Sequence, residues 1–442
     1  MYTTLIESAK VRLKFFIVGV ICATTILGQA SFVLAAPLTD RNDKPSDAAA
    51  LNKISPNTIG GEATFSLELI KTLRVFNTGN ILISPYCAMS SLLLALNGAQ
   101  GTTYQVLSNG LCVGREPLAK IDGDISTIRK TFSYDPTTGI IVGAGDLMPQ
   151  VSVEDASAVW VQNRWPIDPS YVKLVRDSLG ADVYSCDFTK PSGADQINKW
   201  VSYRTHNLIP SIVSPEELVS RKLVLTNALY FHGTWEHPFD VTDTHLAKFT
   251  NLSGIASKVA TMHCIENAEY EETAQYQVAQ ISLGYSRWRM MILLPKSRYS
   301  LEETLSQLSP HVLQQQHTCT PAIIDLSLPR FDMARTFDLA ESLQRMGMGA
   351  ALSSKDANFS SLSSKPLSIG SVVQKVGLRV DEQGVSAVAA TAVEMVGTSS
   401  GLIRTDKIHP KIMKVDHPFY FAIQDKITGL ILVEGIVEDP TL

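Results

Sequence analysis

A continuous apolar run over residues 223–231, reading LVLTNALYF, constrains the fold of this chain more than any other stretch. A strand with one face in water alternates apolar and polar residues, and this run is too continuous for that. It therefore predicts a central strand in a sheet that is covered on both faces. Asn227, in the middle of the run, is expected to be buried and to need hydrogen-bond partners there.

The remaining patterns predict strands and helices in no regular order. Strands are expected at 158–162, 181–184 and 431–440, and helices at 63–76, 89–97, 171–179 and 337–348. Because the two kinds of element do not alternate as in a doubly wound sheet, the sequence predicts an α+β fold.

The composition excludes several functional classes. With 442 residues, 45% of them hydrophobic, the chain can bury a large core, and a formal net charge of −5 gives no sign of a nucleic-acid partner. Six cysteines are widely spaced without a C-x-x-C pair, which fits neither a zinc site nor a dense disulfide scaffold. No metal and no cofactor is expected.

The N-terminus has the pattern of a secretory signal. Lys10, Arg12 and Lys14 precede an apolar stretch that runs to residue 36. We predict a signal peptide over 1–35, a flexible segment over 36–57 and a single domain over 58–442. The protein is then secreted and extracellular, and the sequons at Asn251 and Asn358 are glycosylation candidates. The alternative is that the apolar stretch is retained as a membrane anchor.

A second constraining segment covers residues 380–391 and reads VDEQGVSAVAAT. The side chains that would share one face of a strand are small or apolar: Val385, Ala387, Ala389 and Thr391. Residues 397–401, which read GTSSG, favour an exposed loop. The segment can therefore be either a loop or a strand.

This segment resembles the reactive-loop hinge of the serpins, whose pattern is close to E-x-G-T-x-A-x-A-A-T. The likeness continues over nearly the whole mature chain, because residues 80–103, 197–209 and 223–240 resemble further serpin motifs. It implies a serpin fold: α+β, one domain, three β-sheets, about nine helices, and an exposed reactive loop near the C-terminus. Serpins are protease inhibitors and not enzymes.

The resemblance assigns roles to particular residues. The reactive-loop hinge would consist of Glu382, Gly384, Val385, Ala387, Ala389, Ala390 and Thr391, and the region where the main sheet opens would contain Ser84, Pro85, Asn227, Trp235 and Gln374. Among these assigned residues, two depart from the family. Val385 replaces the usual Thr or Ser, and Gln374 stands where the family often has a histidine.

The mechanism that the resemblance implies needs a partner protease. A target serine protease, or less readily a cysteine protease, would attack the loop and form a covalent acyl complex, and the cut loop would enter the sheet. Counting seventeen residues from Glu382 places the scissile bond at Thr398–Ser399. Arg404–Thr405 is an alternative, as is Lys407. A monomer is expected, without a membrane or nucleic-acid partner.

Two other functions compete with this interpretation. A non-inhibitory serpin that acts as a carrier or chaperone would have the same fold with a loop that does not insert. A serine hydrolase is suggested by residues 397–401, which match G-x-S-x-G literally. That motif needs a strand directly before the serine and a helix directly after it, and neither is predicted here.

Overall fold

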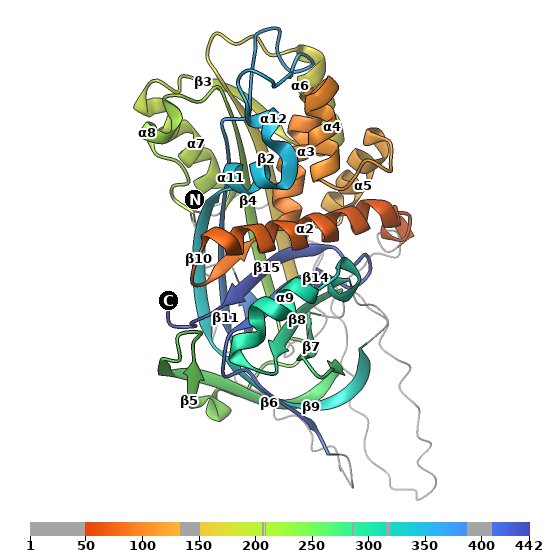
Figure 1. Cartoon of the computed structure of the whole chain (residues 1–442), viewed down its shortest axis with the longest axis vertical. Coiled ribbons are helices and arrows are strands. Elements are labelled where there is room, and N and C mark those ends of the chain that lie inside the picture. The colour runs from red at the N-terminus through yellow and green to blue at the C-terminus, as the bar shows by residue number, and fades with distance from the viewer. Residues whose placement is uncertain are drawn as a thin grey trace, which may run out of the picture. The chain divides into compact units, whose positions relative to one another are not determined.

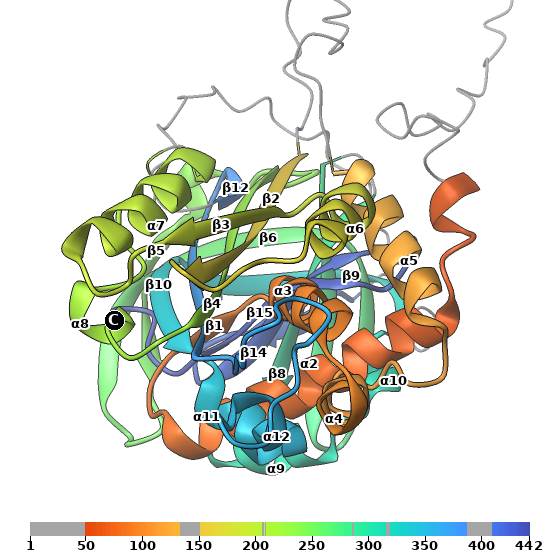
Figure 2. The same cartoon turned by 90° about the horizontal axis from the view of Figure 1, so that it is seen from above.

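The computed structural model describes residues 49–132, 151–205, 207, 209–284, 287–314, 319–386 and 409–442. The described residues belong to one compact unit, Asp40–Leu442. They form two β-sheets with helices packed against them, as Figures 1 and 2 show. The predicted α+β class is confirmed.

The described helices precede, separate and follow the strands without regular alternation. They are α2 (Pro56–Phe76), α3 (Pro85–Gly98), α4 (Gly101–Gly110), α5 (Leu118–Lys130), α6 (Pro169–Leu179), α7 (Pro191–Arg204), α8 (Pro215–Leu218), α9 (Leu301–Gln307), α10 (Pro310–Leu313), α11 (Ala340–Leu343) and α12 (Gly349–Leu352). Within the described part of the chain, no helix is long and apolar enough to cross a membrane.

The smaller sheet has the strand order β10-β11-β12-β4-β2-β3. Its strands are β2 (Val151–Gln162), β3 (Asp182–Cys186), β4 (Leu223–Thr234), β10 (Phe331–Asp338), β11 (Ser371–Asp381) and β12 (Gly384–Ser386). The run at 223–231 thus lies in the interior strand β4, as its apolar character predicted.

The larger sheet has the order β1-β15-β14-β8-β7-β6-β9-β13, with β5 paired to β6. Its strands are β1 (Ile81–Ile83), β5 (His245–Thr250), β6 (Ala256–Glu272), β7 (Tyr276–Leu283), β8 (Trp288–Pro295), β9 (Thr320–Pro329), β13 (Lys411–Lys414), β14 (Phe419–Asp425) and β15 (Ile431–Val437). Three sheets were expected, but hydrogen bonding joins the described strands into two. The reason is that the long β6 pairs with β5 and β9 over most of its length and with β7 at its end.

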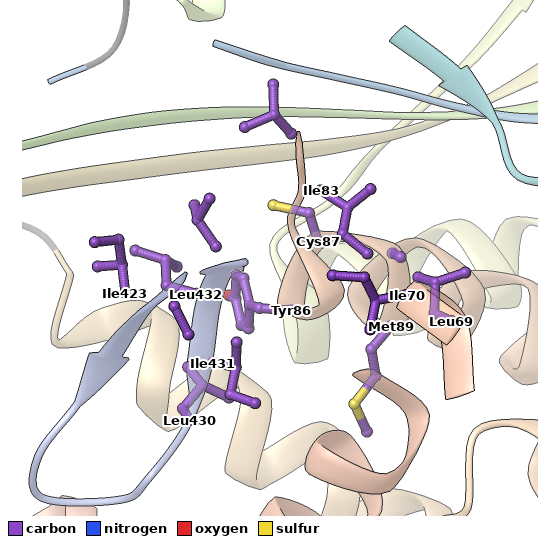
Figure 3. Packing of buried hydrophobic residues seen from close by; sticks show 14 of the residues in the cluster. Leu69, Ile70, Ile83, Tyr86, Cys87, Met89, Ile423, Leu430, Ile431 and Leu432 are labelled. Atoms are coloured by element: carbon purple, nitrogen blue, oxygen red, sulfur yellow. The ribbon is translucent and has the colours of Figure 1, made fainter. Parts of the chain in front are cut away.

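Both faces of β4 are buried because each packs on a different apolar cluster. Leu225 and Leu229 point into the main core, which also takes in α2, α3, β1, β14 and β15. Figure 3 shows part of this core around Tyr86. Val224 and Ala228 point the other way, into a smaller cluster beneath α7. β4 therefore cannot move without disturbing both clusters.

The core of the domain includes residues that the sequence analysis assigned to the flexible segment. Leu51 is 2% exposed and Ile54 is 9% exposed, so both belong to the core although the flexible segment was expected to reach residue 57. The helix expected from residue 63 already starts at Pro56, because Ser55 caps it by accepting a hydrogen bond from the Asn57 amide. The predicted signal peptide lies outside the described residues.

The helix expected over 337–348 is wrong in its first part. Phe337 lies in β10, and the helical turns α11 and η3 (Gln344–Met348) begin only after it. Gly347 has a φ of 88°, which interrupts the helix near its predicted end. Pairing of β10 with β11 outweighs the helical periodicity of this segment.

Candidate functional site

The smaller sheet contains an unfilled position between two of its strands. At one end β4 and β11 pair directly in parallel, from Val224–Asn227 to Ser371–Gln374. At the other end β12 lies between them. In the middle, residues 228–231 of β4 pair only with β2, and residues 375–378 of β11 pair only with β10. We call this middle stretch the slot.

Gly384 and Val385, two residues of the predicted hinge, belong to β12 (Gly384–Ser386), which occupies the mouth of the slot. Val385 pairs with Val380 on one side and Gly233 on the other, and its side chain is 0% exposed in the main core. A Cβ on Gly384 would lie 2.1 Å from the Gly233 carbonyl oxygen. Glycine is therefore required here by close approach of two strands.

The turn before the hinge is held by the segment that follows β4. Trp235 is fully buried, and its Nε1 donates to the Asp381 carbonyl at 2.8 Å. The main-chain amides of Trp235 and Phe239 donate to the carbonyls of Gln383 and Glu382, at 2.9 and 3.0 Å. Trp235, which the resemblance placed where the loop enters the sheet, thus lies against the hinge turn.

Glu382, the first hinge residue, is anchored by an ion pair. Its side chain is 4% exposed, and its carboxylate accepts hydrogen bonds from Arg330 and from the Thr244 hydroxyl. Burial by itself would raise the pKa of Glu382, but the bonds from Arg330 and Thr244 outweigh it and hold the pKa below the usual range. Sequence reasoning missed both partners, since Arg330 stands 52 residues away and no local pattern links the two.

At the closed end of the slot, Gln374 connects β11 to the start of α3. Its Oε1 accepts from the Ser84 amide at 2.9 Å, and its Nε2 donates to the Ser84 carbonyl at 2.7 Å. The Ser84 hydroxyl donates to the Leu432 carbonyl of β15 at 2.5 Å and also caps α3, in which Pro85 is the first residue. We call Gln374 and Ser84 the latch, because their two bonds tie β11 to the core.

Asn227 lies opposite Gln374, in the last parallel pair between β4 and β11. It is 3% exposed, and its Nδ2 donates to the Ser157 hydroxyl of β2 at 2.8 Å. Its Oδ1 is buried and has no hydrogen-bond partner among the residues that the structure describes. The side-chain amides of Asn227 and Gln374 therefore lie at the end of the slot, at the first β4–β11 pair that would have to separate if the slot lengthened.

One contact across the outer face of the slot was not predicted. Lys375 of β11 donates to the carbonyl of Ser211 at 3.1 Å. Ser211 belongs to the connection between α7 and α8, whose neighbours Ile212 and Val213 pack on Val224 and Ala228 of β4 in the smaller cluster. This connection therefore shares an apolar cluster with β4 and is joined to β11 by a hydrogen bond from Lys375.

Several predicted residues lie outside the described part of the chain. These are Ala387, Ala389, Ala390 and Thr391 of the hinge, the scissile-bond candidates Thr398, Ser399, Arg404, Thr405 and Lys407, and the G-x-S-x-G match at 397–401. Their roles stay predictions.

The remaining predicted features lie away from the slot. Asn251 lies in the turn between β5 and β6, and Asn358 lies in an exposed turn after α12. Five cysteines are described, all as free thiols. Among the described residues no group of three metal-binding side chains comes together.

Comparison with known proteins gives one consistent result. A family model described as "Serpin (serine protease inhibitor)" matches residues 61–440. An uncharacterized serpin-like protein of Methanosarcina mazei is 29% identical over 384 residues, which covers 85% of this chain and 86% of the relative. Serpin B10 of Rattus norvegicus is 28% identical over 398 residues, covering 85% and 98%. The native thermophilic serpin Tengpin superposes with a TM-score of 0.74 at 26% identity, covering 86% and 94%.

Proposed function

This chain belongs to the serpin family, and on that premise we propose that it is a secreted inhibitor of a serine endopeptidase that traps its target by inserting its cleaved loop into the slot. Proteins of this family generally inhibit proteases and do not catalyse reactions of their own. One observation carries the proposal: the hinge already pairs with β4 and β11 on both sides, with Val385 buried between them.

The register of β12 defines the path for further insertion. Val385 lies level with Val380 and Gly233, and the chain runs antiparallel to both neighbours. Continued in this register, Ala389 would lie between Val376 and Leu229, inside the slot. Each added residue would pair with strand edges that lack a partner on that side in the described structure.

The residues that would face the core suit this path. Val385 already points into the main core, so every second residue after it would do the same. These residues are Ala387, Ala389 and Thr391, which are small and uncharged. In this register Thr391 would pair with Gln374 on one side and Asn227 on the other. Its hydroxyl could then donate to the Asn227 Oδ1, which has no partner among the described residues.

Insertion beyond residue 390 is opposed by contacts that hold β4 and β11 together. The parallel pairs between β4 and β11 must break, and the strands must move apart by about one strand spacing, ~4.8 Å. The contact between Lys375 of β11 and Ser211 would be strained or lost if β11 moved away from the cluster that the connection shares with β4. The uncut loop would therefore stay out, and cutting it would free its upstream half to cross the barrier.

The covalent step uses the nucleophile of the target. The protease serine oxygen attacks the carbonyl carbon of the scissile residue, the peptide C–N bond breaks, and the leaving nitrogen takes a proton and becomes a new N-terminus. The upstream half remains bound to the protease as an ester. Insertion then carries the attached protease away and distorts its active site before water hydrolyses that ester.

A panel of elastase-like and trypsin-like serine proteases tests the proposal. We expect one of them to form a complex with the protein that survives hot detergent, and the same protease with its serine chemically blocked to form none. The mass of the released C-terminal peptide identifies the bond, since the peptide begins at Ser399 or at Thr405. Complete cleavage without any complex would refute inhibition by that class and favour the carrier or chaperone alternative. A cysteine protease in the panel tests the remaining class of target.

Secretion has its own experiment. The full chain expressed in a secreting host should reach the medium with a new N-terminus near residue 36. Digestion with a glycosidase should lower its mass if Asn251 or Asn358 is modified. Retention in the membrane fraction with Met1 still present would refute the signal-peptide prediction.

A further inference from the structure

Two carboxyl groups lie in the main core without a basic partner. Glu62 of α2 and Glu434 of β15 are each 0% exposed. Glu62 Oε2 accepts from the Ile431 amide at 3.3 Å, and Glu434 Oε2 accepts from the Tyr420 hydroxyl at 2.8 Å. The Oε1 atoms of both glutamates are buried and have no hydrogen-bond partner among the described residues.

The surroundings of the pair contain no compensating positive charge. The titratable groups that act on it are the two carboxyls themselves and the phenol of Tyr420, contributed by α2, β15 and β14. No lysine, arginine or histidine of the described chain forms an ion pair with Glu62 or Glu434. Placing an uncompensated carboxylate in such a site is so costly that the group takes up a proton instead.

We propose that Glu62 and Glu434 form a protonated carboxylic acid pair in the core, that the native fold therefore loses stability as the pH rises toward the point where the pair ionises, and that ionisation of the pair loosens the latch. Two ionised carboxylates side by side would repel each other, whereas a protonated group can donate a hydrogen bond to its neighbour. The pair thus acts as an alkaline-sensitive element of the fold.

The expected pH dependence follows from burial. Burial raises the pKa of Glu434 to about 8, and it raises that of Glu62 as well. In the unfolded chain both groups titrate at about 4.3. As long as the native state binds more protons than the unfolded state, stability falls as the pH rises, and the contribution of Glu434 to this fall ends above about 8.

A short chain of bonds joins the pair to the latch. Glu62 holds the amide of Ile431, and the next residue, Leu432, accepts from the Ser84 hydroxyl. Ser84 in turn makes both bonds to Gln374. Glu434 also belongs to β15, so repulsion between the two ionised carboxylates would act on this strand and, through Leu432 and Ser84, on the latch. The link to sheet opening rests on the proposed function, whereas the effect on stability does not.

The first experiment measures the melting temperature of the intact protein from pH 5 to pH 9.5. We expect a fall of about 3–5 °C between pH 6 and pH 8.5 for the natural sequence. Glu434→Gln, whose amide oxygen can still accept from Tyr420, should flatten this slope. Glu341→Gln, at an exposed side chain, should leave it unchanged. Equal slopes for the natural protein and Glu434→Gln would overturn the proposal.

A second measurement needs no variant of the natural protein. Its infrared spectrum at pH 7 should contain the carbonyl band of a protonated carboxylic acid, and the band should fade as the pH approaches 9. Absence of the band at pH 7 would overturn the proposal. So would a melting temperature at pH 9 that rises when potassium replaces tetramethylammonium, because the pair would then hold a cation instead of protons.

The link to the latch is tested by a rate. Intact protein incubated at pH 7 and pH 9 should lose the loop-exposed, protease-cleavable form severalfold faster at pH 9, and Glu434→Gln should remove this difference. An unchanged rate together with the expected melting curves would leave the acid pair standing and overturn only its link to sheet opening. Failure of the protease panel would leave the melting and infrared results untouched.

Discussion

Replacing Val385 with glutamate tests the hinge most directly. The side chain at this position is 0% exposed between β4 and β11, so the new carboxyl must either ionise in the core or take up a proton. Protonating a glutamate at pH 7.5 costs about 4 kcal/mol. Loss of the buried valine adds about 2 kcal/mol. We therefore expect roughly 6 kcal/mol against any state in which this hinge is inserted.

The assay compares Val385→Glu with Ser386→Glu, one residue further along the same strand. Ser386 points away from the main core and is only half-buried, so its carboxylate can stay hydrated. Val385→Glu should be cut by the target protease at the natural rate, but without a detergent-stable complex and without a rise in melting temperature after cutting. Ser386→Glu should still form the detergent-stable complex and should still show the rise in melting temperature after cutting. A Val385→Glu protein that traps protease as efficiently as the natural one would refute the register derived above.

Three further substitutions have defined outcomes. Gly384→Ala should force the hinge away from the backbone of β4 and lower the melting temperature, whereas Gly60→Ala, in open space on α2, should raise it slightly; equal effects would argue against the close approach. Arg330→Gln should destabilise the protein by about 3 kcal/mol at pH 7, measured by urea unfolding, because it leaves Glu382 buried without its cation. Since the pKa of Glu382 is depressed in the fold, this loss should shrink as the pH falls below about 4.3, and a loss independent of pH would contradict the ion pair. Gln374→Ala should speed spontaneous conversion to a loop-inserted form by removing both bonds of the latch, and an unchanged rate would show that the latch does not control opening.

Much of the fold was readable from local patterns. The continuous apolar run of β4 predicted a strand buried on both faces, because no half-exposed strand can be apolar throughout. The alternation after Gly384 predicts that Val385 is buried when the loop inserts, and in the described structure its side chain already lies in the main core. Errors came where two signals competed. Residues 337–348 have helical periodicity, yet Phe337 completes a ladder with β11 that local spacing does not reveal.

The sequence by itself determined the family, and it predicts the position of the hinge and the side chains that the hinge would bury, since these depend on residue types at short spacing. Only the tertiary structure decided which partners stabilise them. Arg330 reaches Glu382, Ser84 reaches Gln374 and Glu62 reaches the Ile431 amide, each across 52 or more residues of chain. Hydrogen bonds and charges act over a few ångströms in space, whatever the separation along the chain, so no local pattern could have paired these groups.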